Sequence, residues 1–131
     1  MDLIDAGNNI CIYTDVLVKN DTIRIYNMHL ASVHLAEENY KFIENINNQE
    51  TEEQIDGSKK IVSLLKEAFI KRSIQADIIS KHIKQSQYKV VVCGDFNDTP
   101  SSYAYKIISD ELCDSFRESG AGIGATYNGS I

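Results

Sequence analysis

Two side chains able to handle a phosphate or a water molecule, Asp95 and Asn97, stand two residues apart, just after the apolar run 90–92. A carboxylate there can orient a water molecule or take its proton, and a carboxamide can donate hydrogen bonds to a phosphate oxygen. Loops that follow strand ends often carry such groups. However, Gly94 and its polar neighbours are also the residue types that an ordinary turn favours. From the residue types alone, both interpretations stand.

A second candidate pair, Asn27 and His29, lies at the end of the segment 22–30, which is rich in β-branched and aromatic residues. Strand alternation puts both on one face, in line with Ile23 and Ile25. A polar pair that continues an apolar row suggests a binding or catalytic role. A hydrogen-bonded core histidine is the alternative interpretation of His29.

Residues 90–97, Val-Val-Val-Cys-Gly-Asp-Phe-Asn, resemble the apolar strand and Gly-Asp-x-Asn motif of the endonuclease/exonuclease/phosphatase superfamily, which includes deoxyribonuclease I. Residues 26–30 are similar to the Asn-x-His-Leu strand of the same family. The two motifs stand in the family's order, with a helix containing Arg72 and Gln75 between them. The likeness extends from about Ile10 to Tyr127. It implies an α+β layered sandwich, an incomplete deoxyribonuclease I-like fold with a mixed sheet flanked by helices.

The resemblance also implies roles for the site residues. Asp95 would activate or orient the attacking water, and His29 would hydrogen-bond the phosphate and stabilise charge in the transition state. Asn97 would position the scissile phosphate, and Asp95 and Asn97 would contact a metal ion, Mg²⁺ or Mn²⁺. The implied activity is divalent-metal-dependent hydrolysis of a phosphate ester. The substrate stays open among nucleic acid, phospholipid and small phosphate esters.

Three further residues are candidates on the substrate side: Asn27, Asp98 and Thr126. Asn27 could instead fix the end of its strand, and Asp98 could instead stabilise the turn before Thr99. Thr126 belongs to a segment, 126–129, that resembles the loop before the family's next strand. Arg72 falls on the apolar stripe of the predicted long helix, where an unpaired charge is costly, so we expect a structural ion pair there or an apolar stem that carries the charge to solvent.

Departures from the family pattern bear on activity. We predict no strand before Ile10 that could supply the family's metal-binding Glu, and the sequence contains no Asp-His pair. Residues 1–131 are therefore expected to be a partial domain without the family's N-terminal part and Asp-His segment, binding metal poorly and hydrolysing little on its own. A non-catalytic binding or scaffold domain of the same fold is the alternative. An unrelated α/β module with a chance motif is a third interpretation.

Hydrophobic periodicity predicts the elements that must position these residues. We expect a β-hairpin from residues 10–19 and 22–30 around Asn20 and Asp21, and a short helix at 34–46. A loop over 47–57 would lead to an amphipathic helix of about seven turns from an N-cap at Ser58 to Ile83. A strand at 88–93, covered on both faces, would precede a helix at 101–109 with Thr99 as its cap, and a short strand is expected near 126–127.

Composition narrows the class of protein. With 131 residues, 43% hydrophobic and 24% charged, the chain suits a globular domain. Its net charge of −6, without a basic cluster, disfavours a duplex nucleic acid as substrate unless a cation mediates. Cys11 and Cys93 are predicted to be small buried residues, and His34 and His82 to be solvated. No apolar run could span a bilayer and no signal peptide is visible, which favours an intracellular location. We predict no protein partner.

Overall fold

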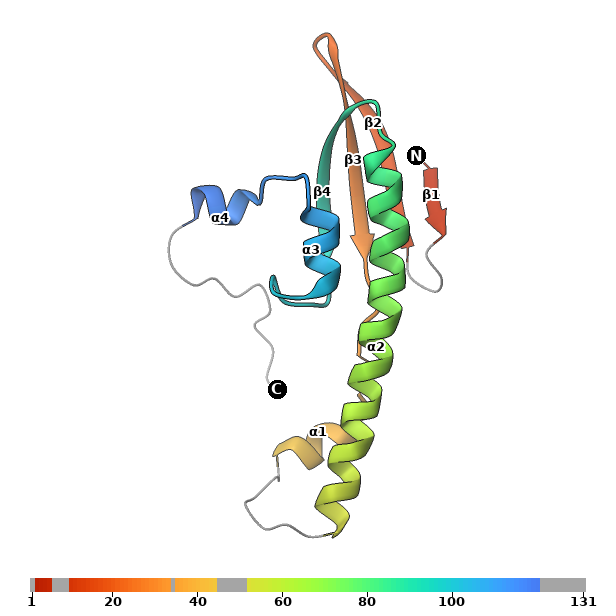
Figure 1. Cartoon of the computed structure of the whole chain (residues 1–131), viewed down its shortest axis with the longest axis vertical. Coiled ribbons are helices and arrows are strands. Elements are labelled where there is room, and N and C mark those ends of the chain that lie inside the picture. The colour runs from red at the N-terminus through yellow and green to blue at the C-terminus, as the bar shows by residue number, and fades with distance from the viewer. Residues whose placement is uncertain (1, 6–9, 34, 45–51, 121–131) are drawn as a thin grey trace. The chain divides into compact units, whose positions relative to one another are not determined.

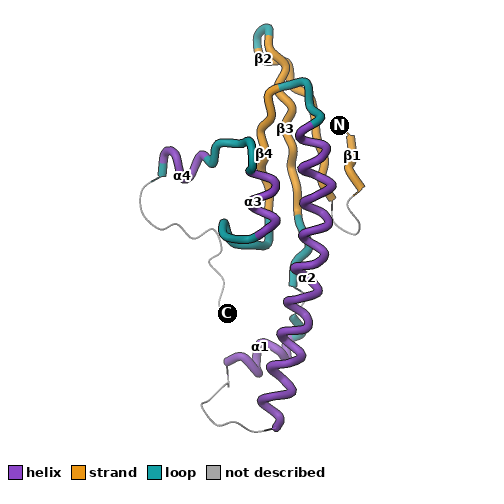
Figure 2. Tube along the Cα trace, in the orientation of Figure 1, coloured by secondary structure: helices purple, strands orange, loops and turns teal. Residues whose placement is uncertain are grey.

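The computed structural model describes residues 2–5, 10–33, 35–44 and 52–120. Four strands form one mixed sheet in the order β1–β2–β3–β4 (Figure 1): β1 Asp2–Asp5, β2 Ile10–Val18, β3 Asp21–His29 and β4 Lys89–Asp95. The first three strands are antiparallel, and β4 runs parallel to β3. The helices are α1 Glu37–Glu44, α2 Glu52–Lys84, α3 Tyr103–Ser109 and α4 Ser115–Ser119 (Figure 2). The predicted α+β class and mixed sheet are confirmed.

The chain divides into two compact units. The first, the sheet unit, comprises residues 1–32 and 68–112, and the second comprises residues 33–67 and 113–131. In the sheet unit, the later turns of α2 cover one face of the sheet (Figure 1). The core between them contains side chains from the strands, from α2 and from α3: Ile4, Cys11, Tyr26, Met28, Leu30, Ala76, Ile79, Ile83, Ala104 and Ile108.

The predicted hairpin is confirmed, with its turn one residue earlier than expected. Val18 pairs with Asp21, so Lys19 and Asn20 form the turn, and Lys19 adopts a positive φ of 57°. The prediction that no strand precedes Ile10 is wrong, because β1 does, although its sequence Asp-Leu-Ile-Asp contains no Glu. β1 is four residues long and pairs with β2 through partners such as Leu3 and Ile12, and so short a strand leaves little alternation to detect.

Helix boundaries differ from the predictions in both α1 and α2. α1 lies within the predicted span 34–46, and His34 lies outside the described residues. α2 begins at Glu52, so Ser58 is not its N-cap and part of the predicted loop 47–57 is helical. An acidic residue at a helix N-terminus interacts favourably with the helix dipole. The start of α2 was predicted from the spacing of apolar residues, which does not contain this information. None of the described helices combines the length and the hydropathy needed to cross a membrane.

The helix predicted at 101–109 is present as α3, but its cap is Ser102 and not Thr99. The Ser102 side chain accepts a hydrogen bond of 3.1 Å from the Tyr105 amide. Thr99 belongs to the preceding turn, where its carbonyl oxygen accepts a 3.0 Å bond from the Ser102 amide. The chain therefore completes one tight turn after the Gly-Asp-x-Asn motif before the helix starts.

β4 is confirmed as a strand, but it is not covered on both faces. Val91 is 48% exposed and Cys93 is exposed, so the predictions of burial for these two positions are wrong, whereas Cys11 is fully buried as expected. The reason is that α2 and α3 cover only the face to which Val90 and Val92 point. On the opposite face, Leu3 is 63% exposed. We refer to this side as the open face of the sheet.

Close approach of β3 and β4 requires a glycine at position 94. Gly94 pairs with Met28 and has a φ of +135°, a conformation that residues with a side chain rarely adopt. A Cβ atom at this position would overlap the carbonyl oxygen of Met28. One residue further on, the carbonyl oxygen of Asp95 accepts a 2.9 Å hydrogen bond from the Leu30 amide. The two strands are thus in register up to their ends.

We predict that Gly94→Ala destabilises the protein by about 3 kcal/mol or more, because it combines backbone strain with a backbone clash. Chemical denaturation monitored by circular dichroism measures the change. Val91→Thr, on the open face of the same strand, is the control and is expected to cost less than about 1 kcal/mol. A Gly94→Ala variant as stable as this control would contradict the prediction.

An aromatic and charged cluster joins the C-terminal end of α2 to the sheet. The Tyr26 hydroxyl oxygen lies 2.9 Å from His82 Nδ1, and the ring of Tyr13 contacts that of His82 at a tilt of 45°, with centroids 4.8 Å apart. Arg24 lies over the Tyr13 ring at 4.5 Å and pairs with Asp15 at 2.6 Å. His82 is therefore half-buried and hydrogen-bonded, and the prediction that it is solvated is wrong.

The cluster predicts how stability depends on pH. Burial, and secondarily the charge of Arg24, lower the pKa of His82 below its ordinary value of 6.5. The unfolded chain then takes up a proton that the folded chain resists, so this contribution is complete above pH 6.5 and is lost as the pH falls below it. The hydrogen bond from Arg24 lowers the pKa of Asp15 below 3.8, so Asp15 contributes to the pH dependence of stability only in more acidic solution.

We predict that His82→Gln reduces the loss of unfolding free energy as the pH falls from 6.5 towards the range in which carboxylates titrate. Urea denaturation at a series of pH values measures it. Lys81→Gln, at the preceding residue of α2, is the control and should leave the pH dependence unchanged. If His82→Gln has the same pH dependence as the unsubstituted protein, the prediction is wrong.

Candidate functional site

The two predicted motifs meet at the ends of β3 and β4. His29 and Asp95 are register partners, as are Asn27 and Cys93. Burial alternates along the end of β3, where Tyr26 and Met28 are buried while Asn27 and His29 are exposed. The register therefore puts Asn27, His29 and Asp95 on the open face, at the edge where both parallel strands end. Polar groups from distant parts of the sequence are brought together here by strand pairing.

The turn after β4 holds Asn97 against the end of β3. Asn97 has a φ of 49°, in the left-handed region that asparagine tolerates better than most residues. Its backbone N–H donates to Asp95 Oδ1 at 2.8 Å, and its side-chain Nδ2 donates to the Leu30 carbonyl oxygen at 2.9 Å. The side chain of Asn97 thus keeps Oδ1 and one N–H of its amide for a ligand. The hydrogen bond within this turn does not involve Oδ2 of Asp95, so that oxygen is also available to a ligand.

Asp98 points into the protein. Its Oδ2 forms an ion pair of 2.9 Å with Nε of Arg72, and the two side chains are only 7% and 3% exposed, respectively. Its Oδ1 accepts a 2.9 Å hydrogen bond from the Thr99 amide. Of the two predicted roles, contacting substrate and stabilising the turn, this geometry matches the second. Of the two roles expected for Arg72, an ion pair and a stem that reaches solvent, the structure shows the ion pair.

Arg72 also contacts the segment that follows β3. Nη1 donates to the carbonyl oxygen of Ala31 at 2.8 Å, and the Ala31 amide donates to Oε1 of Gln75 at 2.9 Å. The guanidinium group lies over the ring of Phe69 at 4.7 Å. Arg72 and Gln75 are one helical turn apart on α2, and both are buried. The hydrogen bonds from Arg72 and Gln75 to Ala31 were not predicted. The sequence did contain a sign of them, because two long polar residues on an apolar helix stripe need polar partners.

Phe96, the variable residue of the Gly-Asp-x-Asn motif, faces the core. It packs against the core cluster, and its ring centroid lies 5.7 Å from that of Tyr105 in α3. The side chains of Phe96 and Asp98 thus anchor the loop while Asp95 remains exposed. The loop therefore combines two side chains that face the protein interior with one carboxylate that is open to solvent.

These residues fit part of a divalent metal site but do not complete one. Mg²⁺ requires near-octahedral coordination by oxygen and usually keeps several waters beside one or two carboxylates. Asp95 and Asn97 offer two such oxygens. In the part of the chain that the structure describes, no group of three or more His, Cys, Asp or Glu side chains could hold a metal ion. Thr126 and the strand predicted near 126–127 lie outside the described residues.

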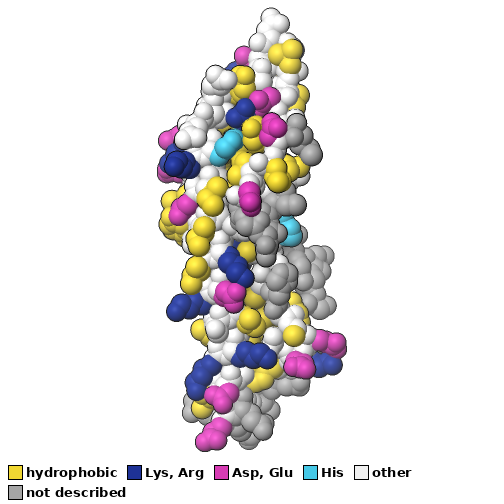
Figure 3. All heavy atoms as spheres, turned by 90° about the vertical axis from the view of Figure 1, so that its right-hand side faces the viewer, with side chains coloured by type: hydrophobic (Ala, Val, Ile, Leu, Met, Phe, Trp, Pro, Cys, Tyr) yellow, Lys and Arg dark blue, Asp and Glu magenta, His cyan; other side chains and the backbone are white. Residues whose placement is uncertain are grey.

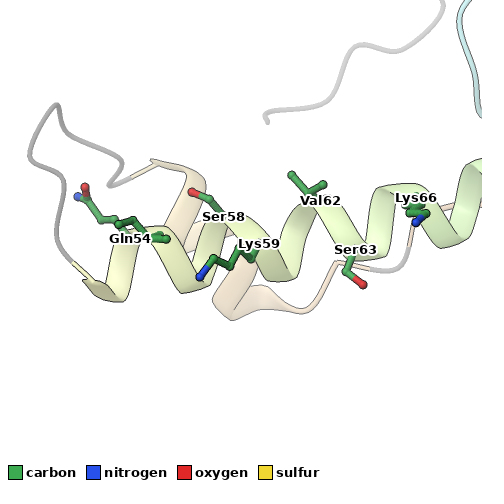
Figure 4. Close-up of a pocket in the computed structure, with 7 residues that line it drawn as sticks. Gln54, Ser58, Lys59, Val62, Ser63 and Lys66 are labelled. Carbon is green, nitrogen blue, oxygen red and sulfur yellow. The ribbon is translucent and has the colours of Figure 1, made fainter.

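A separate hollow of about 570 Å³ lies along the first half of α2, in the second unit (Figure 4). Apolar side chains such as Val62 and basic side chains such as Lys59 and Lys66 line it. Lys59 already forms an exposed ion pair of 3.1 Å with Asp56. None of the predicted site residues is among those that line this hollow.

Surface charge is mixed. On the face that Figure 3 shows, acidic and basic side chains are interspersed, with hydrophobic side chains between them. Several basic residues of the sheet unit are neutralised by a carboxylate, as in the pairs of Lys89 with Asp21 and of Lys84 with Asp110. Among the residues described on this face, no basic patch of the kind that tracks a nucleic-acid backbone is present.

Comparison of the chain with protein-family models finds no match, and comparisons with curated proteins and with solved structures find none either.

Proposed function

We propose that this chain contributes part of the active site of a divalent-metal-dependent phosphate-ester hydrolase, in a fold of the deoxyribonuclease I type that its motifs resemble. One observation carries the proposal. The residues of the two motifs, separated by the whole of α2 in sequence, come from adjacent parallel strand ends and share the open face. A chance Gly-Asp-x-Asn turn would not require an Asn-x-His strand as its register partner.

In this proposal the carboxylate of Asp95 accepts a proton from the attacking water or orients it. The imidazole of His29, on the register partner of Asp95, hydrogen-bonds a phosphate oxygen and stabilises the charge that develops on it. Asn97 donates its remaining amide N–H to the same phosphate, because its other N–H is engaged by Leu30. Asn27 lies two residues before His29, on the same face of β3, and contacts the substrate in this proposal.

A divalent cation, when bound, would neutralise phosphate charge and lower the pKa of a coordinated water. Asp95 and Asn97 would be its contacts on this chain, and the coordination would require further ligands. With a net charge of −6 and no basic patch among the described residues that Figure 3 shows, long-range attraction of a polyanion is weak. This supports a small phosphate ester or a phospholipid headgroup as substrate over a long nucleic acid.

In a protein that supplies the remaining metal ligands, we expect Mn²⁺- or Mg²⁺-dependent hydrolysis of bis(p-nitrophenyl) phosphate, measured by the release of p-nitrophenol, whereas residues 1–131 alone should hydrolyse it slowly. Asp95→Asn should lower kcat by at least about 100-fold, because general base catalysis contributes that much or more. His29→Gln should also lower kcat. EDTA should abolish the reaction.

Asp110→Asn is the matched control, since it removes one carboxylate from an exposed ion pair outside the proposed site. Its activity should equal that of the unsubstituted protein. The proposal fails if Asp95→Asn, folded as judged by circular dichroism, hydrolyses the ester at the normal rate. It also fails if no divalent cation supports hydrolysis when the remaining metal ligands are supplied, and a non-catalytic domain then becomes the better hypothesis.

A further inference from the structure

We propose that Arg72 is a positioning residue, which sets the distance between the end of β3 and the loop after β4 through its contacts with Ala31 and Asp98. Its effect on the geometry of these segments follows from contacts in this chain. Its effect on catalysis rests on the proposed function. Arg72 itself is buried and touches no exposed site residue, so it acts through the two segments that it joins.

The guanidinium group uses two different edges for the two segments. Nε faces Asp98 at 2.9 Å, whereas Nη1 faces the carbonyl oxygen of Ala31 at 2.8 Å. Because the group is planar and rigid, it fixes the two acceptors relative to each other. A lysine ammonium could keep the charge at this position, but it lacks the fork that spans both acceptors.

Each acceptor lies next to a group of the proposed site. Asp98 directly follows Asn97, whose side chain reaches back to the Leu30 carbonyl oxygen. Ala31 directly follows Leu30, whose amide is bonded to the Asp95 carbonyl oxygen. The contacts therefore form a closed loop from α2 through Ala31 and Leu30 to Asn97 and back through Asp98. Gln75 adds a second bond from α2 to Ala31 and holds that segment from its amide side.

Stability alone is a weak reason for this arrangement. A buried ion pair gains little over well-packed apolar residues of similar volume, because both charges lose their hydration. Removing one partner is a different matter, since it leaves the other charge buried and unpaired. Replacement of both partners by apolar residues thus separates the two roles: it removes the links to the loop and to Ala31 without leaving an unpaired carboxylate.

The test measures hydrogen exchange by NMR for two reporters: the side-chain amide of Asn97 and the backbone amide of Leu30. Three variants of the whole chain are compared with the unsubstituted protein. Arg72→Lys keeps the charge and loses the fork. Arg72→Met combined with Asp98→Leu removes the pair. Lys84→Met, on the same helix, removes an exposed ion pair with Asp110 and is the matched control.

We expect protection of both reporters to fall by at least about tenfold in Arg72→Lys and in the double variant, while the urea midpoint of the double variant stays close to normal. The Lys84→Met control should retain full protection. Normal protection of Asn97 in a folded double variant would overturn the proposal. Global unfolding of both Arg72 variants would overturn it as well, since the pair would then act on stability.

Measurement of phosphodiester hydrolysis in the same variants separates this proposal from the proposed function. Loss of protection together with a lower kcat and an unchanged KM supports both. Loss of protection in a protein that hydrolyses no ester supports the positioning role and removes only the proposed activity. A normal rate and normal protection in Arg72→Lys leave the activity intact and remove the positioning role.

Discussion

The parallel pairing of β3 with β4 is the constraint on which the candidate site depends. Antiparallel neighbours would put the ends of the two strands at opposite edges of the sheet, and Asp95 could then not be the partner of His29. The pairing requires the backbone to approach closely at Gly94, where the Met28 carbonyl oxygen occupies the space of a side chain. It also requires a long crossover, which α2 provides. The helix, the glycine and the register are therefore parts of one arrangement.

α2 covers one face of the sheet and leaves the other face open. On the covered side its later turns bury Ala76 and Ile79 in the core, and its polar residues Arg72 and Gln75 bond to the segments that follow the strands. On the open side, strand alternation leaves His29 and Asp95 exposed. The same loop thus presents one carboxylate to solvent, at Asp95, and buries another three residues later, at Asp98.

Residue types and alternation predicted the hairpin, the long helix and β4, because each has a strong local pattern. They also gave an ion pair as one of two expected roles for Arg72, since a charge buried without a partner is costly. The start of α2 at Glu52 was missed because charge at a helix end, and not apolar spacing, extends it. The exposure of Val91 and Cys93 was missed because an unbroken valine run does not reveal which face is covered. The contacts of His82 were missed because Tyr13 and Tyr26 are distant in sequence.

The backbone requirements of the Gly-Asp-x-Asn turn have a consequence for its evolution. Gly94 excludes any side chain, Asn97 occupies a left-handed conformation, and Phe96 fills part of the core. Selection for folding alone would therefore preserve three of the four residues 94–97, whether or not the protein is a catalyst. Apart from the hydrogen bond that Asp95 accepts from the backbone of Asn97, none of the described contacts gives Asp95 or His29 a comparable structural role. If the proposed activity holds, substitutions at these two positions among related proteins would distinguish those that had lost the activity from those that kept it.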